Sequence, residues 1–295
     1  MNNSILKLKC IKKLNYSNID YIIKNYNLKY FDEYDLSEIL IDSKLKNSNI
    51  PLIYIDEIKR AFDISQNIIL KSEKLGIKKI EIIDKSYPNI LKEIDNSPQV
   101  LFVRGNETIL NEDSVSIVGT RSPTERGIYD AKVLSQNIDY NVVSGLALGI
   151  DTVAHTYSNK SIAVMPCSLD TIYPKENKNL SERIINDGGC LVSEYMIGSS
   201  ISRYNFVLRN RIQSGLSKCV IVVECSNKSG TMHTAKFCVN QNRMLAVCKN
   251  LSSGNIELLN KNTFMIDNNI SELNKKIHKF VINSKDDYQQ IVFNI

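Results

Sequence analysis

From residue 114 onward, the chain alternates short apolar runs, rich in β-branched residues, with amphipathic stretches. The apolar runs predict buried strands at Val115–Val118, Asn141–Ser144, Ser161–Val164, Cys190–Ser193, Cys219–Val223 and Met244–Val247. Helical stretches separate them near residues 124–138, 150–158, 178–187, 207–215 and 231–240. Continuously apolar strands that alternate with helices are typical of a parallel sheet covered on both faces. The pattern therefore predicts an α/β domain with a mostly parallel sheet.

The first 75 residues show a different pattern, with helical spacing at Leu36, Ile39 and Leu40 and again at Ile58 and Phe62. We expect several short helices in a small N-terminal domain over residues 1–75, one of them beginning at Pro51. The α/β domain should span residues 76–285. It begins with a connector over 76–113 that includes a strand at Val100–Val103, and it closes with Thr263–Ile266 and a helix over Ile270–Phe280. Residues 286–295 are expected to form a tail.

Composition adds few constraints to this picture. The formal net charge of +5 permits nucleic acid as a partner without requiring it. The seven cysteines form no C-x-x-C pair and no zinc-type spacing, which indicates buried thiols in a reducing cytoplasm. The N-terminus lacks the apolar core of a signal peptide, and no apolar run is long enough to span a membrane.

Glycine and arginine are unevenly distributed. Gly76 is the only one of the twelve glycines before residue 105, and Arg60 is the only arginine before residue 104. Tight turns and planar guanidinium groups therefore occur together in the α/β domain. This combination indicates an anion-binding region.

The first βα loop carries Gly119, Thr120, Arg121 and Ser122. Ser122 three residues before Glu125 predicts a capping box, with a proline between them at the first helical position. A helix start at the end of a strand favours anions, although an ordinary turn with an exposed arginine has the same pattern. Neither the dinucleotide motif G-x-G-x-x-G nor a phosphate-binding G-x-x-x-x-G-K-[ST] loop occurs, so ATP-driven chemistry is not expected.

Two further loops follow predicted strands. Gly145 and Gly149 surround a bend, after which Asp151 could cap a helix or fix His155. A solitary histidine on a helix is more often a packing residue than a catalyst. In the next loop Tyr173 and Lys175 offer an aromatic face beside an ammonium group, which suits single-stranded nucleic acid, although the segment is equally typical of a surface loop.

The segment from Asn205 to Ile212 holds two arginines on either side of Asn210. Arg209 and Arg211 could clamp a phosphate, or could form an intramolecular salt bridge to Glu194 or Glu224. A last cradle, with Gly230 and Thr231, opens the helix after strand Cys219–Val223. No Ser/His/Asp order, paired carboxylates or metal cluster emerges, so we expect no enzymatic activity.

Seven short segments in this order resemble the DNA-processing protein A (DprA/Smf) family over residues 86–270. The segments are Ser86–Pro88 with Leu101–Gly105, Ile117–Arg121, Ser144–Asp151 with His155, Leu169–Asn177, Ser193–Tyr195, Phe206–Ile212 and Ser229–Ala235. The resemblance implies a Rossmann-like domain, a mostly parallel sheet with helices on both faces and no nucleotide cofactor. A small all-α (SAM-like) N-terminal domain should precede it.

The resemblance also implies a function: binding of single-stranded DNA, homodimerisation, and delivery of the DNA to a RecA-type recombinase in natural transformation and homologous recombination. Carried over position by position, the DNA contacts fall on Gly119, Arg121, Ser122, Gly145, Lys175, Phe206, Arg209, Asn210 and Arg211, with Gly230 and Thr231 at the rim. Thr120 and Gly149, in the same loops, complete the predicted site.

The chain departs from the family pattern at several points. Leu148 stands where a lysine or arginine is usual, which should remove one phosphate contact. Ser168 replaces a glycine, and Cys248 with Lys249 replaces a Pro-Gly pair. The C-terminal winged helix of many members is expected to be absent.

Two other functions remain open on the same residues. Nucleotide phosphoribohydrolases with a related architecture look like P-G-G-x-G-T-x-x-E at the cleft. Here Thr234 stands where their acid/base glutamate would be, which argues against hydrolysis. A nucleotide-binding sensor using the same cleft is the second alternative; it should bind mononucleotides and bind oligonucleotides weakly.

Overall fold

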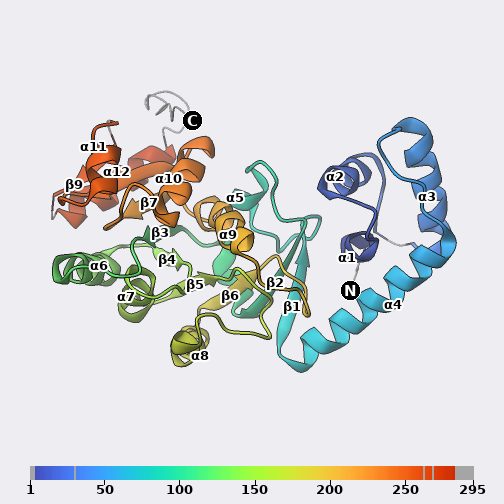
Figure 1. Ribbon diagram of the computed structural model, residues 1–295, viewed down its shortest axis with the longest axis horizontal. Coiled ribbons are helices and arrows are strands. Elements are labelled where there is room, and N and C mark those ends of the chain that lie inside the picture. Colours follow the sequence, from blue (N-terminus) through green and yellow to red (C-terminus); the bar gives the residue numbers. More distant parts are fainter. Residues whose placement is uncertain (1–3, 30, 262, 268, 283–295) are drawn as a thin grey trace.

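The structure is a computed structural model that describes residues 4–29, 31–261, 263–267 and 269–282 (Figure 1). A helical N-terminal region and a large sheet domain make up this part of the chain. The predicted tail, residues 286–295, lies outside the described residues. No helix in these ranges is long and apolar enough to cross a membrane.

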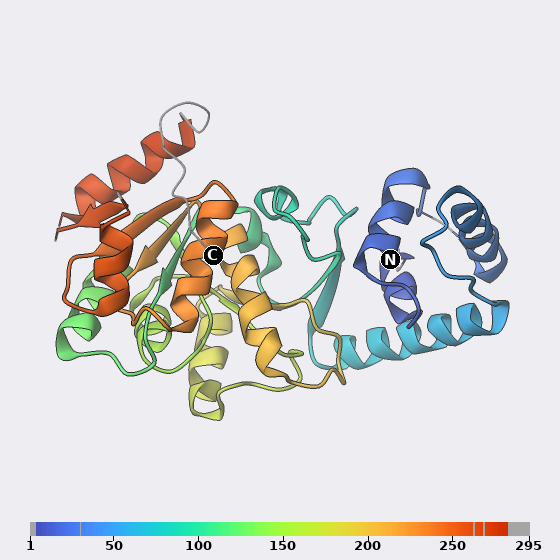
Figure 2. The ribbon, with the colours of Figure 1, turned by 45° about the horizontal axis from the view of Figure 1, so that its top comes forward.

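The N-terminal region contains four helices: α1 (Ser4–Cys10), α2 (Tyr16–Asn25), α3 (Glu33–Lys46) and α4 (Ile55–Lys74). Asn15 caps α2 and Asp32 caps α3, each accepting a hydrogen bond from a backbone amide of the first turn. The expectation that Pro51 starts a helix is wrong, because α4 begins four residues later, after Tyr54. Figure 2 shows the long α4 leading from the other three helices to the sheet.

The sheet has nine strands in the described residues, in the order β1-β2-β6-β5-β4-β3-β7-β8-β9. The bounds are β1 (Ile77–Glu81), β2 (Val100–Gly105), β3 (Ser114–Val118), β4 (Asn141–Ser144), β5 (Ser161–Val164), β6 (Cys190–Ser193), β7 (Cys219–Val222), β8 (Met244–Cys248) and β9 (Phe264–Ile266). Strands β3 to β9 run parallel, whereas β1 and β2 pair antiparallel at one edge. The predicted mostly parallel α/β sheet is confirmed, and the connector over 76–113 supplies two of its strands.

Helices cover both faces of this sheet (Figure 1). Apolar residues of α6 (Glu125–Asn137), α7 (Ile150–Tyr157) and α12 (Ile270–Ile282) cluster with Val115, Ile117 and Ile221 on one face, where α8 (Lys178–Asn186) also packs beside α7. The other face is covered by α5 (Asn89–Lys92), α9 (Arg203–Gly215), α10 (Gly230–Asn240) and α11 (Ser253–Leu259). Two 3₁₀ turns, η1 (Glu107–Asn111) and η2 (Lys175–Asn177), lie in the connecting loops.

The strand order reverses direction at β3. After β3 the chain adds β4, β5 and β6 on one side, and then returns to add β7, β8 and β9 on the other. Loops that leave β3 and its neighbours β4 and β7 therefore diverge above their carboxyl ends. Open α/β sheets bind their ligands in the crevice at such a switch point.

Candidate functional site

A pocket of about 330 Å³ lies above the carboxyl ends of β3 and β7, at the switch point. Loops that follow β3, β4 and β7 form it together with one face of α9. Eight of the predicted site residues line it: Gly119, Thr120, Arg121, Phe206, Arg209, Asn210, Gly230 and Thr231. The fold thus gathers segments that lie more than 100 residues apart in the sequence.

Aromatic rings and a guanidinium group meet at the mouth of the pocket. The Phe206 ring packs edge-on against Tyr173, with 5.3 Å between ring centroids, and the Arg121 guanidinium lies 5.7 Å from the Phe206 centroid. Arg121 is exposed and forms no ion pair with the described residues. A smaller hollow of about 50 Å³ adjoins these side chains and is also lined by Leu148 and Gly145. The mouth therefore offers a positive charge beside aromatic faces.

Exposed cations continue along the same edge of the sheet. Lys175 begins η2, Arg203 begins α9, and Lys228 lies in the loop between β7 and α10. None of these three forms a salt bridge within the described part of the chain. Together with Arg121 they are free to contact an extended anion.

Gly145 and Gly149 let the loops approach one another closely. A Cβ on Gly145 would lie 2.4 Å from the Nη1 and Nη2 atoms of Arg209. Gly149 has a φ of +80°, and a Cβ there would lie 2.3 Å from the carbonyl oxygen of Thr120. Both glycines therefore contribute to the site because they have no side chain, which lets neighbouring groups approach their backbone closely. Neither glycine lines the 330 Å³ pocket.

The bend between these glycines is fastened by Asp151 and Asn177. The Asp151 carboxylate accepts hydrogen bonds from the amides of Gly145 (3.1 Å) and Ala147 (3.3 Å), and the Asn177 side chain donates to the carbonyl of Leu146 (2.9 Å). The amides of Gly145 and Ala147 are thus already bonded to a carboxylate of the protein. The suggestion that Asp151 caps α7 or fixes His155 is also wrong.

His155 bonds instead to the hydroxyl of Ser161, at 3.0 Å from its Nδ1. It is buried, and burial followed by the nearby Arg209 charge lowers the pKa of His155 to about 3. The ring is therefore neutral near pH 7. His155 is therefore a packing residue in this fold, which is the more common role of a solitary histidine on a helix.

The start of α6 differs from the predicted capping box. Thr124, and not Ser122, caps the helix, which begins at Glu125. The Glu224 carboxylate accepts from the Thr124 amide (3.0 Å) and hydroxyl (2.9 Å), so this helix start already holds an anion of the protein itself. Ser122 is exposed, and its amide donates to the Thr120 hydroxyl at 3.2 Å.

The start of α10 is less fully bonded. Among the described residues, none accepts a hydrogen bond from the amides of Gly230 and Thr231. Thr231 donates its hydroxyl to the carbonyl of Gly119 at 3.0 Å, which links the loops after β3 and β7. Both residues line the pocket, and their amides at the start of a helix can receive a phosphate or another acceptor.

The two central arginines of α9 point to different surroundings. Arg209 lines the pocket but is buried, and it donates to the carbonyls of Gly145 (2.7 Å) and Val164. Arg211 lies outside the pocket and pairs with Glu194 at 2.7 Å, as one of the two interpretations of the sequence proposed. A clamp in which both guanidinium groups face one phosphate is not formed in this arrangement.

Arg209 nevertheless contributes charge to the site. Burial lowers the pKa of Arg209 to about 10, and the neighbouring Asp151 opposes that shift. The guanidinium is thus protonated near pH 7. Burial raises the pKa of Asp151, and Arg209 opposes that change. Arg209 therefore brings a positive charge to the pocket wall, next to the Asp151 carboxyl group.

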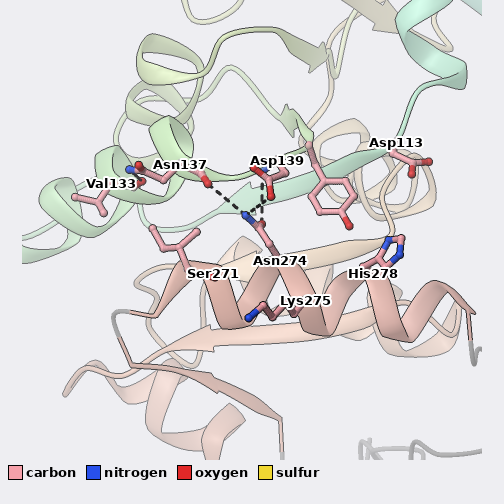
Figure 3. Close-up of a pocket in the computed structure, with 10 residues that line it drawn as sticks. Asp113, Val133, Asn137, Asp139, Ser271, Asn274, Lys275 and His278 are labelled. Carbon is pink, nitrogen blue, oxygen red and sulfur yellow. Dashed lines mark hydrogen bonds between the residues drawn. The ribbon is translucent and has the colours of Figure 1, made fainter.

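A larger hollow of about 920 Å³ lies elsewhere, between α12 and the segment joining α6 to β4 (Figure 3). Asn274 of α12 bridges it by donating to Asp139 (2.8 Å) and to the carbonyl of Asn137 (3.4 Å). This hollow is at the amino ends of β3 and β4, opposite the switch point. Although this hollow is larger, its position makes it a weaker candidate for the ligand site than the pocket at the switch point.

The match to known families agrees with the geometry at the switch point. The model of the family described as DNA recombination-mediator protein A matches residues 78–278, which include every strand from β2 to β9. The chain belongs to the DNA recombination-mediator protein A family. The family is the one, also called DprA/Smf, that the sequence segments resemble.

Individual DprA/Smf relatives cover different shares of the chain. The DNA processing protein DprA of Streptococcus pneumoniae is 34% identical over 223 residues, which are 73% of this chain and 77% of that protein. Protein Smf of Synechocystis is 42% identical over 171 residues, and the match spans only 43% of its length.

Two solved DprA structures have the same fold. The X-ray structure of DprA from Streptococcus pneumoniae has a TM-score of 0.74 and 29% identity, covering 90% of this chain and 94% of that one. DprA from Helicobacter pylori, whose structure concerns its single-stranded DNA binding mode, has a TM-score of 0.63 and 30% identity, covering 69% of this chain and 96% of that one. The fold predicted from the resemblance is confirmed, helical N-terminal region included.

Several residues of the site were not singled out by the sequence. Gln213 and Thr234 also line the pocket, and both are buried. Gln213 follows Phe206 and Asn210 on the same face of α9, at a spacing that helical periodicity could have revealed. Glu224 and Asn177, which fasten the loops, give no local signal of that role.

Proposed function

We propose that the switch-point pocket and its cationic edge bind single-stranded DNA. The observation that carries this proposal is the group at the mouth, where the unpaired Arg121 lies over Phe206 and Phe206 packs on Tyr173. Unstacked bases bind to aromatic faces, and a positive groove follows the phosphates of a single strand. Duplex DNA keeps its bases stacked and therefore cannot use these rings.

The phosphates have three kinds of partner in this proposal. Exposed Arg121, Lys175, Arg203 and Lys228 neutralise them along the edge of the sheet. The amides of Gly230 and Thr231 fix one phosphate at the start of α10. Arg209 adds positive charge from beneath, although its donors are directed to carbonyl groups. Leu148 is 41% exposed beside this path and supplies an apolar contact where a basic residue is usual.

Binding without catalysis is the second part of the proposal. Thr234 occupies the position of the glutamate that phosphoribohydrolases use, and Asp151, which also lines the pocket, already accepts two amide hydrogen bonds. In the described ranges no group of three or more His, Cys, Asp or Glu residues could hold a metal ion. For catalysis, the pocket would need a general acid or base that can exchange a proton with the substrate.

Family membership supports the finer parts of the proposal. We infer that the protein acts in the cytoplasm as a homodimer, and that it passes single-stranded DNA to a RecA-type recombinase during recombination and natural transformation. All seven cysteines are free and buried, as expected in a reducing compartment. The RecA partner and the homodimer are inferred from the family alone.

The test of the site is replacement of Arg121. Arg121→Ala should weaken binding of a single-stranded oligonucleotide by about tenfold at low salt, because a charge-assisted contact to phosphate is lost. The slope of log affinity against log salt should become shallower by about 0.7. Arg121→Lys should keep the slope and lose part of the affinity, since lysine does not stack on Phe206 as arginine does.

Arg60→Ala is the matched control for this test. Arg60 is an exposed arginine on α4, in the N-terminal region, so its removal changes the net charge equally. If Arg60→Ala and Arg121→Ala weaken binding to the same extent, the effect is one of net charge and the proposed site is wrong.

A further inference from the structure

The loop that carries Arg121 is fastened at both ends to a single residue, Glu224. This residue follows β7, which pairs with β3 on the side away from β4. The Glu224 main-chain carbonyl accepts a hydrogen bond from the Thr120 amide at 2.7 Å. The Glu224 carboxylate accepts from the Thr124 amide (3.0 Å) and hydroxyl (2.9 Å). Residues 121–123 therefore form a short bridge between two contacts with the same neighbouring residue.

The two ends of this bridge are held in different ways. At the first end the bonds are between main-chain groups, since the Thr120 carbonyl also accepts from the Ile150 amide at 3.1 Å. At the second end, where α6 begins, it is the Glu224 side chain that accepts from Thr124. Hydrogen bonds to a charged acceptor are stronger than those between neutral groups. The Glu224 carboxylate is thus the side chain that fixes where the bridge meets the helix.

The position of the Arg121 guanidinium depends on this bridge. Among the described residues, no ion pair or hydrogen bond holds the Arg121 side chain, and its contact is with the Phe206 ring, 5.7 Å from the guanidinium to the ring centroid. Ordering a loop and a long side chain during binding lowers affinity, and ordering them beforehand avoids this loss. A backbone that is already fixed at both ends therefore favours binding through Arg121.

Space for the Glu224 carboxylate is provided by Gly127, in the first turn of α6. A Cβ at residue 127 would lie 2.0 Å from Oε2 of Glu224. Glycine within a helix is less favourable than alanine. Here the missing side chain lets the carboxylate reach the start of the helix, so the two residues work as a pair.

The negative charge of Glu224 is itself unfavourable for binding of an anion. A carboxylate next to the Arg121 loop repels phosphates that approach this loop, and salt screens the repulsion only in part at short range. Charge alone therefore predicts that removal of this carboxylate strengthens binding of DNA. A favourable role must come from the hydrogen bonds that the carboxylate accepts.

We propose that Glu224 is a positioning residue for the binding of single-stranded DNA. Its carboxylate holds the Thr124 end of the loop and thereby keeps the Arg121 guanidinium at the mouth of the pocket before the strand arrives. The inference rests on the proposed binding of single-stranded DNA and adds a residue that need not touch the strand. It predicts that loss of a negative charge weakens binding to an anion, which is the opposite of the effect of charge alone.

The test compares Glu224→Ala with Glu224→Gln in titrations with a fluorescent single-stranded 30-mer. Both variants remove one negative charge, but glutamine keeps an oxygen that can accept from Thr124. Glu224→Ala should weaken binding about fivefold, since a loosened loop must then be ordered when the strand binds. Glu224→Gln should stay within about twofold of the wild type, because a neutral acceptor keeps most of the contact.

Glu125→Ala is the matched control for charge. Glu125 is exposed at the first position of α6, next to Thr124, and its side chain forms no salt bridge within the described ranges. Its replacement should leave binding unchanged or slightly stronger. Gly127→Ala displaces the carboxylate without changing the net charge and should weaken binding as Glu224→Ala does. If Glu224→Ala fails to fold, by thermal melting, Gly127→Ala decides the outcome.

Coupling to Arg121 separates positioning from a general loss of structure. In an Arg121→Ala background, Glu224→Ala should cause little further loss of affinity, because the guanidinium that it positions is gone. The inference is overturned by a further loss of the same size in that background, by equal losses in Glu224→Ala and Glu224→Gln, or by unchanged or stronger binding in a folded Glu224→Ala. Failure of the wild-type protein to bind any oligonucleotide would instead overturn the proposed function itself.

Discussion

At the scale of single residues, the site contains positions where the packing leaves no space for a larger side chain. Gly145 is the clearest case, because the Arg209 guanidinium packs directly on its Cα and also donates to its carbonyl at 2.7 Å. A side chain at residue 145 would push this guanidinium away from two carbonyls at once. The glycine thereby sets the position of a buried charge beneath the pocket.

Gly145→Ala should lower the free energy of unfolding by about 1–3 kcal/mol, the usual cost of overpacking a buried position. Urea denaturation measures this loss. Gly230→Ala is the control, since a Cβ there meets nothing within 4 Å and the position is helical. Equal stability of the two variants would show that Arg209 moves aside freely and that its placement is not fixed by Gly145.

At the scale of elements, helix α9 has two polar faces with different roles. Phe206, Asn210 and Gln213 face the pocket, whereas Arg211 faces Glu194 after β6. The Arg211 and Glu194 side chains are only 10% and 13% exposed. The ion pair therefore holds the middle of α9 against the end of β6, and it positions the residues that line the pocket.

Glu194→Gln should destabilise the protein by about 3 kcal/mol, because it leaves the Arg211 charge nearly buried without its partner. The double variant Glu194→Gln with Arg211→Met should recover part of this loss, since the Arg211 charge is removed while the nearby Lys9 ammonium still lacks the Glu194 carboxylate. Chemical denaturation of the wild type and both variants measures the difference. A single variant as stable as the wild type would mean that the pair does not hold α9.

The same helix shows how far sequence reasoning reaches. Periodicity located α9 at 207–215, and the helix begins one turn earlier because Ser202 caps it. The pattern could not show that Arg209 and Arg211 point apart into different surroundings, since that depends on which strands the helix crosses. For the same reason Glu224 at the start of α6 was not predicted, because it is 100 residues distant in sequence from Thr124.

The strands were predicted more fully than the loops. β4, β5 and β6 begin and end at the predicted residues, because a strand buried on both faces appears in the sequence as a short, mainly apolar run. β1 was missed within the connector, since Lys78 and Lys79 interrupt its apolar pattern at an edge of the sheet. Short polar interruptions of this kind are ordinary in edge strands.

At the scale of the whole molecule, topology brings the site together. The loops after β3, β4 and β7 meet because β3 lies between the other two strands in the sheet. The N-terminal helices are attached through polar as well as apolar contacts: the Leu6 amide donates to Glu81 at 2.9 Å, and the Gln99 side chain donates to the carbonyl of Tyr16 at 3.0 Å. A pocket at the switch point with a cationic, aromatic mouth follows from this arrangement.

The most direct test of the central claim is a titration of the wild-type protein with a fluorescent single-stranded 30-mer, the matched duplex and a mononucleotide at several salt concentrations. We expect tight binding of the single strand, a slope against log salt of about −0.7 for each phosphate neutralised, and much weaker binding of the duplex. Saturable binding of the mononucleotide, with no binding of the 30-mer, would contradict the account and favour a nucleotide sensor.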